Sequence, residues 1–265
     1  EVRAALDQAQ PGSIDWITVV GSGEPTLYRR LGWLLSRIKD LTEIPVAVIT
    51  NGSLLYDPGV RADLTQADAI MPTLDAGDQR LFRKINRPHP SLTLRRQVEG
   101  LQAFRREYRG RLWPEVMLIK DMNDTEEALS AIAEELKAIG PDEIHLSLPE
   151  RPPAESGVAP ADAVGIMRAT GLLGSVARVL SPAAGRFDLS KGTDVVDSVI
   201  NVITRHPMRE TELREELDRN TAGRSDEVLR ELSESGRTQV IERHGTRFWT
   251  AGPARYGRNI SRKPQ

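Results

Sequence analysis

The sequence predicts an α/β fold, a partial parallel (β/α) barrel followed by a small winged-helix-like domain. Short apolar runs alternate with segments of helical periodicity, a pattern typical of strands that pair in parallel. Four of these runs are directly followed by a glycine or a polar residue, namely Gly21, Thr50, Thr73 and Asp121. In the last third of the chain, three helical segments precede a hairpin pattern. We therefore expect a core domain over residues 1–182, a linker over 183–192, a winged-helix-like domain over 193–250 and a basic tail over 251–265.

The first apolar run, residues 16–20, predicts a strand that turns toward a helix at Gly21-Ser22-Gly23-Glu24-Pro25. The glycines allow a tight turn and a close approach of the backbone to a ligand. Glu24 follows the strand directly, and its carboxylate can accept a hydrogen bond from an ammonium group. A purely structural turn is the alternative for this segment taken by itself.

Polar residues also follow the next predicted strands. In a parallel fold the carboxyl ends of the strands meet at one mouth, so these residues are expected to share one site. The predicted strands cover residues 46–49, 69–72 and 115–120, and the polar residues that follow them are Thr50, Asn51, Thr73, Asp75 and Asn123.

In their order along the chain, these motifs resemble those of the radical S-adenosylmethionine (SAM) superfamily. Gly21 to Pro25 is similar to its Gly-Gly-Glu-Pro motif, and the resemblance covers roughly residues 15–182. Within the superfamily, residues 21–27, 50–55 and 85–89 look most like the branch of wyosine-type tRNA-modifying synthases. The resemblance implies that Gly23 and Glu24 hold the methionine part of SAM. It also implies that the ribose and adenine lie among Thr50, Asn51, Thr73, Asp75 and Asn123.

The family binds a [4Fe–4S] cluster through a Cys-x3-Cys-x2-Cys loop, and this chain contains no cysteine. We expect a fragment that lacks the first strand and the cluster loop, because the chain starts at Glu1 rather than Met. The complete protein would then cleave SAM reductively at the cluster, with an electron donor, and take hydrogen from an unknown substrate. This chain alone is predicted to be inactive. The alternative is a cluster-free relic that regulates by binding a ligand, protein or DNA.

Five residues are candidates for substrate contact. Asn86, Arg87 and His89 share a loop bounded by proline, Glu115 begins a strand, and Arg151 stands in a proline-rich segment. The structural alternatives are a solvated helix face for the cations of residues 78–89, a hydrogen-bonding role within the loop for His89, an ion pair for Glu115 and a linker for Arg151. The substrate is a small molecule or a protein, with tRNA also possible.

The charges of the last domain argue against specific DNA binding. Residues 193–250 contain 12 Asp and Glu against 9 Lys and Arg, and the third helical segment, residues 225–235, is acidic. Phosphate contacts need a basic footprint, so we expect a packing, lid or protein-contact role instead.

Composition sets broader limits. The 265 residues carry a net charge of −2 and are 39% hydrophobic, which suits a cytoplasmic protein with a sizeable core. No apolar run approaches the roughly 20 residues that span a bilayer. No paired carboxylates, metal-ligand cluster or nucleophilic triad is recognisable from spacing. An ordinary hydrolase is therefore unsupported.

Overall fold

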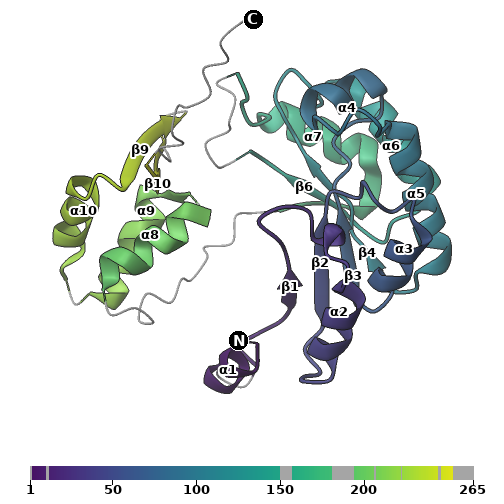
Figure 1. Cartoon of the computed structure of the whole chain (residues 1–265). Coiled ribbons are helices and arrows are strands. Elements are labelled where there is room, and N and C mark those ends of the chain that lie inside the picture. The colour runs from purple at the N-terminus through teal and green to yellow at the C-terminus, as the bar shows by residue number, and fades with distance from the viewer. Residues whose placement is uncertain are drawn as a thin grey trace, which may run out of the picture. The chain divides into compact units, whose positions relative to one another are not determined.

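Parallel strands alternate with helices in the first part of the chain (Figure 1). The computed structural model describes residues 2–9, 12–149, 157–180, 194–205, 207–221, 223–243 and 246–252. One parallel sheet has the order β1-β2-β3-β4, and a second has the order β5-β6-β7. The strands are β1 (Ile17–Val19), β2 (Val46–Thr50), β3 (Ala69–Pro72), β4 (Arg111–Leu112), β5 (Glu115–Met117), β6 (Ile144–Ser147) and β7 (Ala177–Val179).

Backbone hydrogen bonds join these two sheets along β3. Trp113 donates its backbone N–H to the Ile70 carbonyl at 2.9 Å, and Leu74 donates to the Glu115 carbonyl at 2.9 Å. Pro114 lacks an N–H, which accounts for the break between β4 and β5. The strand predicted over residues 115–120 is wrong in length, since β5 ends at Met117. Leu118 still donates its N–H to the Ser147 carbonyl of β6 at 2.8 Å, and Ile119 then forms an isolated antiparallel bridge with Pro160.

Helices lie beside the strands, with α3, α5 and α6 on their outer side in Figure 1. Most of the longer helices begin at an Asp or Thr whose side chain accepts a backbone N–H of the first turn, as in α5, α6 and α7. The helices of this part are α1 (Val2–Gln8), η1 (Pro25–Leu27), α2 (Leu31–Lys39), α3 (Pro58–Leu64), α4 (Gln79–Ile85), α5 (Leu94–Glu107), α6 (Glu126–Ile139), α7 (Ala163–Leu173) and η2 (Gly174–Val176).

The core lies between the sheet and these helices. Val116 and Leu118 are fully buried in it, whereas Glu115 and Met117 are half-buried. Side chains alternate between the faces of a strand, so Glu115 and Met117 lie on the face opposite the helices. A carboxylate is thus kept out of the apolar core.

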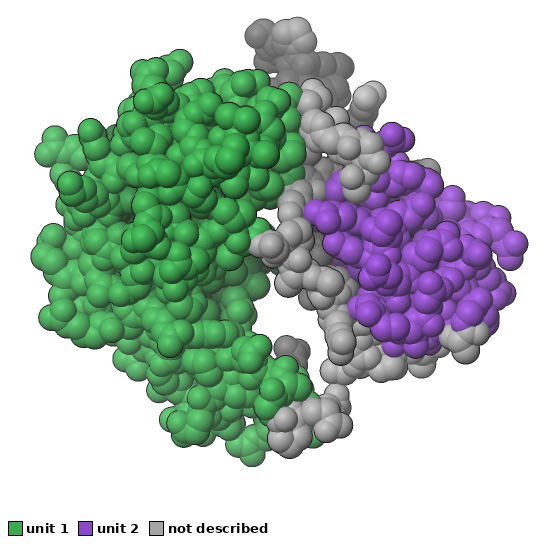
Figure 2. Space-filling model, turned by 180° about the vertical axis from the view of Figure 1, so that it is seen from behind, with its two compact units in different colours: residues 1–149, 157–181 green, residues 150–156, 182–265 purple. Residues whose placement is uncertain are grey.

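The chain divides into two compact units, residues 1–149 with 157–181, and residues 150–156 with 182–265 (Figure 2). In the second unit, β10 pairs antiparallel with both β8 and β9. The three helical segments and the hairpin predicted from the sequence are present, and β8 was not predicted. The elements are α8 (Val195–Arg205), β8 (Met208–Arg209), α9 (Glu210–Asn220), α10 (Ser225–Glu234), β9 (Thr238–Arg243) and β10 (Thr246–Ala251).

The second unit has its own apolar core, which includes Val199, Leu213, Leu232 and Trp249. The predicted linker over 183–192 and the tail beyond residue 252 lie outside the described residues. Within the described part of the chain, no helix has the length and apolar character needed to cross a membrane.

Candidate functional site

The carboxylate of Glu24 joins the carboxyl ends of β1 and β2. Its Oε1 accepts hydrogen bonds from the backbone N and Oγ1 of Thr26, at 3.0 and 2.6 Å, and from Thr50 Oγ1 at 2.5 Å. Its Oε2 accepts the backbone N–H of Asn51 at 2.7 Å. An ionised carboxylate offers about two acceptor directions on each oxygen. Among the described residues Oε2 therefore keeps one free direction, whereas Oε1 is saturated.

The two glycines before Glu24 differ in what they permit. A Cβ at Gly21 would lie 2.9 Å from the carbonyl oxygen of Gly23, so this turn requires glycine there. A Cβ at Gly23 would meet nothing within 4 Å, and Gly23 is exposed. The backbone beside Glu24 is thus open to a ligand.

The ends of β2 and β3 lie next to each other. Thr50 is buried, and its carbonyl accepts the Thr73 N–H at 3.0 Å. Gly52 has a φ of 71°, a left-handed conformation that favours glycine, and donates to Thr50 Oγ1 at 3.1 Å. Asn51 is exposed and Thr73 is half-buried, so both side chains lie near the surface of this mouth.

Asp75 is the buried carboxyl group of the site, only 4% exposed. Its Oδ1 accepts the Met117 N–H and its Oδ2 accepts Asn86 Nδ2, both at 2.8 Å. Burial raises the pKa of Asp75 to about 6, and the negative charge of nearby Glu115 adds to the rise, against the effect of the two hydrogen bonds. Asp75 therefore titrates close to neutral pH.

This raised pKa predicts that the contribution of Asp75 to the stability of the folded protein grows on acidification. The unfolded carboxyl has a pKa of about 3.9, so the stabilisation by Asp75 is complete below pH ~4 and is lost as pH rises through ~6. Between pH 7 and pH 4, the free energy of unfolding of the wild type should rise by about 2 to 3 kcal/mol relative to that of Asp75→Asn. Urea unfolding at several pH values measures this difference. A constant difference across the range would contradict the raised pKa.

Two of the predicted substrate residues lie against Asp75. Asn86 donates to it, and Glu115 acts on its pKa. Glu115 also accepts a hydrogen bond from Ser147 Oγ at 2.6 Å. The buried Asn86 Oδ1 has no hydrogen-bond partner among the described residues. Spacing did not reveal this carboxylate pair, because it depends on β3 lying beside β5.

The other substrate candidates are not brought to Asp75. His89 is exposed, and its Nδ1 lies 2.8 Å from Ser91 Oγ within its own loop. Arg87 is also exposed and has a φ of 47°, an uncommon conformation for a residue with a Cβ. Arg151 lies outside the described residues.

Asn123 is buried and stabilises the backbone of the site. It is 0% exposed, its Oδ1 accepts the Ile119 N–H at 2.7 Å, and its Nδ2 donates to the carbonyls of Asp75 and Met117, each at 2.9 Å. The side-chain amide of Asn123 therefore bonds to backbone groups, and it connects the loop after β3 to the end of β5.

Sequence reasoning missed one buried amide, Gln97 on α5. It is 4% exposed, and its Nε2 donates to the carbonyls of Asn51 at 3.0 Å and Thr73 at 2.8 Å. Its signal in the sequence was a polar residue on the apolar face of α5, where Leu94, Val98 and Leu101 are buried.

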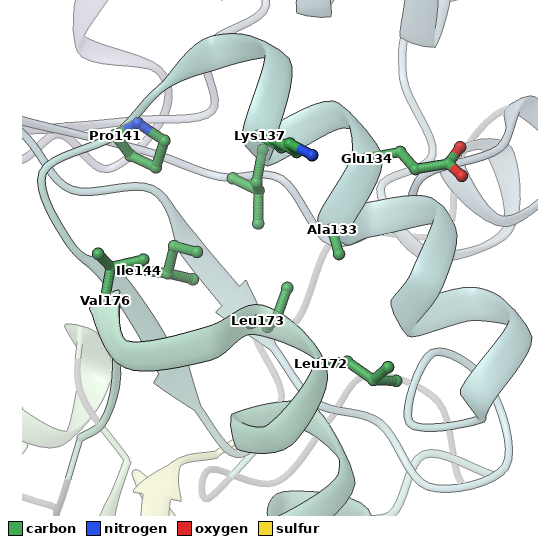
Figure 3. Close-up of a pocket in the computed structure, with 9 residues that line it drawn as sticks. Ala133, Glu134, Lys137, Pro141, Ile144, Leu172, Leu173 and Val176 are labelled. Carbon is green, nitrogen blue, oxygen red and sulfur yellow. The ribbon is translucent and has the colours of Figure 1, made fainter.

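A cavity of about 350 Å³ lies elsewhere, between α6 and α7 (Figure 3). Its lining is mostly apolar, with Leu173 pointing toward Ala133 of α6 and Val176 beside Ile144. None of the predicted site residues lines it. Within the described residues, no group of three or more His, Asp and Glu side chains is placed to hold a metal ion.

Comparison with known proteins gives both relatives and structural neighbours. No family model matches the chain. A UPF0026 protein of Methanocaldococcus jannaschii is 30% identical over 264 residues, which cover 98% of this chain and 81% of that protein. The GTPase Obg of Brachyspira hyodysenteriae is 47% identical over 134 residues, but the match spans only 51% of this chain and 20% of that GTPase. That partial match carries no activity to this chain.

Solved structures show the same fold at low sequence identity. A radical SAM methyltransferase from Sphaerobacter thermophilus has a TM-score of 0.52 at 20% identity, over 68% of this chain and 54% of its own. A domain of pyruvate-formate lyase-activating enzyme from Bacteroides vulgatus has a TM-score of 0.50 at 17% identity, over 62% of this chain and 98% of its own. The first unit therefore has an α/β fold with parallel sheets like those of radical SAM domains. Given the relative that matches almost its whole length, the chain belongs to the UPF0026 protein family.

Proposed function

We propose that the first unit binds SAM at the carboxyl ends of β1, β2 and β3, as part of a radical SAM enzyme. The observation that carries the proposal is the geometry of Glu24. Donors from Thr26, Thr50 and Asn51 orient its carboxylate, and Oε2 keeps an acceptor direction beside the open backbone of Gly23. The ammonium group of the methionine part would donate to Oε2. A charge-assisted hydrogen bond of this kind is stronger than one between neutral groups.

The neighbouring residues have distinct parts in this proposal. Thr50 is buried and orients Glu24, whereas the exposed Asn51 and the half-buried Thr73 remain accessible to the ribose and adenine. Asp75 and Asn123 lie deeper, and Asn123 supports the loop rather than facing a ligand. SAM held here would supply the sulfonium group whose cleavage starts radical chemistry.

A [4Fe–4S] cluster does not fit the residues of this chain. The sequence has no cysteine, and the described residues offer no alternative cluster of ligands. We therefore assign only SAM binding to these 265 residues. In the complete protein, we infer that the cluster and an electron donor act with this unit, and that the chain alone binds SAM without cleaving it.

The substrate side of the proposal rests on charge. Arg80, Arg83 and Lys84 are exposed on α4, and none forms an ion pair with the described residues. This cationic face lies next to Asn86 and favours a substrate with an anionic group. Transfer RNA, the substrate of the wyosine-type branch, carries anionic phosphates, but many small molecules and acidic proteins are anionic as well. The charge of α4 therefore does not distinguish these substrates, and membership of the wyosine-type branch stays a prediction.

For the second unit we propose a winged-helix-like fold that contacts protein. Its order α8-β8-α9-α10-β9-β10, with β10 between β8 and β9, supports the fold. Its third helix, α10, exposes Glu231 and Glu234, which phosphates repel. A regulator that works through this unit, with no SAM bound to the first, is the second candidate function.

Calorimetric titration of the 265-residue protein with SAM separates the two functions. We expect the wild type to bind and Glu24→Ala to lose about 1.5 to 3 kcal/mol of binding free energy, because the ammonium loses its charged partner. Glu43→Ala, an exposed glutamate in the turn before β2, is the matched control and should bind like the wild type. Duplex DNA in place of SAM should give no heat of binding. Unchanged SAM affinity in a folded Glu24→Ala protein would reject Glu24 as the ligand, and absence of binding by the wild type would favour the regulator.

A further inference from the structure

We propose that Gln97 is a positioning residue for the SAM site, an inference that rests on the proposed function. Gln97 lies on α5 and belongs to none of the strand-end motifs. Its single Nε2 donates to the carbonyls of Asn51, after β2, and Thr73, after β3. One buried amide therefore holds together the two loops that would face the ribose and adenine.

The environment of Gln97 explains why it is polar. Its neighbours on the same face of α5, Leu94, Val98 and Leu101, are buried and apolar. Burying an amide among them costs free energy unless the amide is hydrogen-bonded. The carbonyls of Asn51 and Thr73 accept these hydrogen bonds. The polar side chain of Gln97 therefore stabilises the two loops and not the helix that carries it.

A second contact holds α5 against the same loop. A Cβ at Gly100 would lie 2.6 Å from the backbone N of Tyr56 and 2.8 Å from the carbonyl carbon of Leu55. A Cβ at Gly52 would lie 3.4 Å from Gln97 Nε2. The helix thus packs directly on residues 52–56, and Gln97 reaches the loop at the point where it leaves β2.

The Asn51 backbone connects Gln97 to Glu24. The Asn51 carbonyl accepts from Gln97, while the Asn51 N–H donates to Glu24 Oε2, the oxygen with a free acceptor direction. Without the Gln97 donor, the Asn51 carbonyl loses this hydrogen bond and the backbone at Asn51 becomes more mobile. We expect this to weaken the hydrogen bond from the Asn51 N–H that orients Glu24. Gln97 therefore acts on the ligand through Asn51 and Glu24 and need not touch it.

Two substitutions test this role. Gln97→Met keeps a similar volume but removes the donor, and we expect it to weaken SAM binding about tenfold. Gln97→Glu keeps the shape, but its carboxylate faces two carbonyl oxygens. Only its protonated form can donate to one of them, so its SAM affinity should recover as pH falls from 8 to 5.5, relative to Gln97→Met at each pH. Gln102→Met, the same change at a half-buried position of α5, is the matched control and should bind like the wild type.

Hydrogen–deuterium exchange gives a readout that does not depend on SAM. In Gln97→Met we expect faster exchange at the amides of Asn51, Gly52 and Thr73, and unchanged exchange in α2. Wild-type exchange at these amides, or a Gln97→Met protein that binds SAM as tightly as the wild type, would overturn the proposal. If even the wild type binds no SAM, the proposed function fails, and the exchange experiment still decides whether Gln97 holds the two loops.

Discussion

Gly77→Ala is expected to destabilise the first unit by about 3 kcal/mol or more, at the upper end of the cost of overpacking. Gly77 lies in the loop between β3 and α4. A Cβ built on it would be 2.2 Å from the carbonyl carbon of Ala131 and 2.4 Å from the backbone N of Ile132. These are backbone atoms in the middle of α6, so no side-chain rotation can relieve the clash. The loop or the helix must move, and Asp75, two residues earlier, would move with it.

Chemical denaturation followed by circular dichroism measures this loss of stability. Gly171→Ala on α7 is the control, because a Cβ there meets nothing within 4 Å. That change should stabilise the protein by about 0.5 to 1 kcal/mol, since alanine favours the helix. Equal midpoints for the two variants would show that the loop does not pack on α6 as described.

Asn123→Ala should cost about 3 to 5 kcal/mol of stability. The change leaves one N–H and two carbonyls without their partner in a place with no exposure to water, and each such group costs at least about 1 kcal/mol. The expected result is a lower unfolding midpoint. Any loss of SAM affinity should come from disorder of the loop after β3 and not from a lost contact with the ligand.

Gln66→Ala removes a side-chain amide from the surface of the same unit and serves as the control for Asn123, with an expected change within about 0.5 kcal/mol. Comparing stability and affinity distinguishes the two possible roles of Asn123. An unchanged midpoint together with weak SAM binding would show that Asn123 contacts the ligand directly rather than supporting the loop.

Much of the fold and part of the site follow from the sequence. Apolar runs of strand length that alternate with helical periodicity specify parallel pairing, because a parallel strand needs a crossover helix. The polar residues after consecutive strands then meet at one mouth. On this basis the prediction that Glu24, Thr50 and Asn51 lie together is confirmed by their hydrogen bonds.

Tertiary structure alone decided which residues support that site. Gln97 joins the loops after β2 and β3 only because α5 packs on the loop after β2. Glu115 acts on Asp75 only because β5 lies beside β3. Neither relation is visible in spacing, since strand order and helix docking depend on contacts between distant segments. Sequence likewise shows that Asn123 is polar at a strand end, but the inward direction of its amide depends on where Asp75 and Met117 present their carbonyls. Local pattern determines the elements, whereas a buried polar group takes its role from the partners that the assembled fold brings to it.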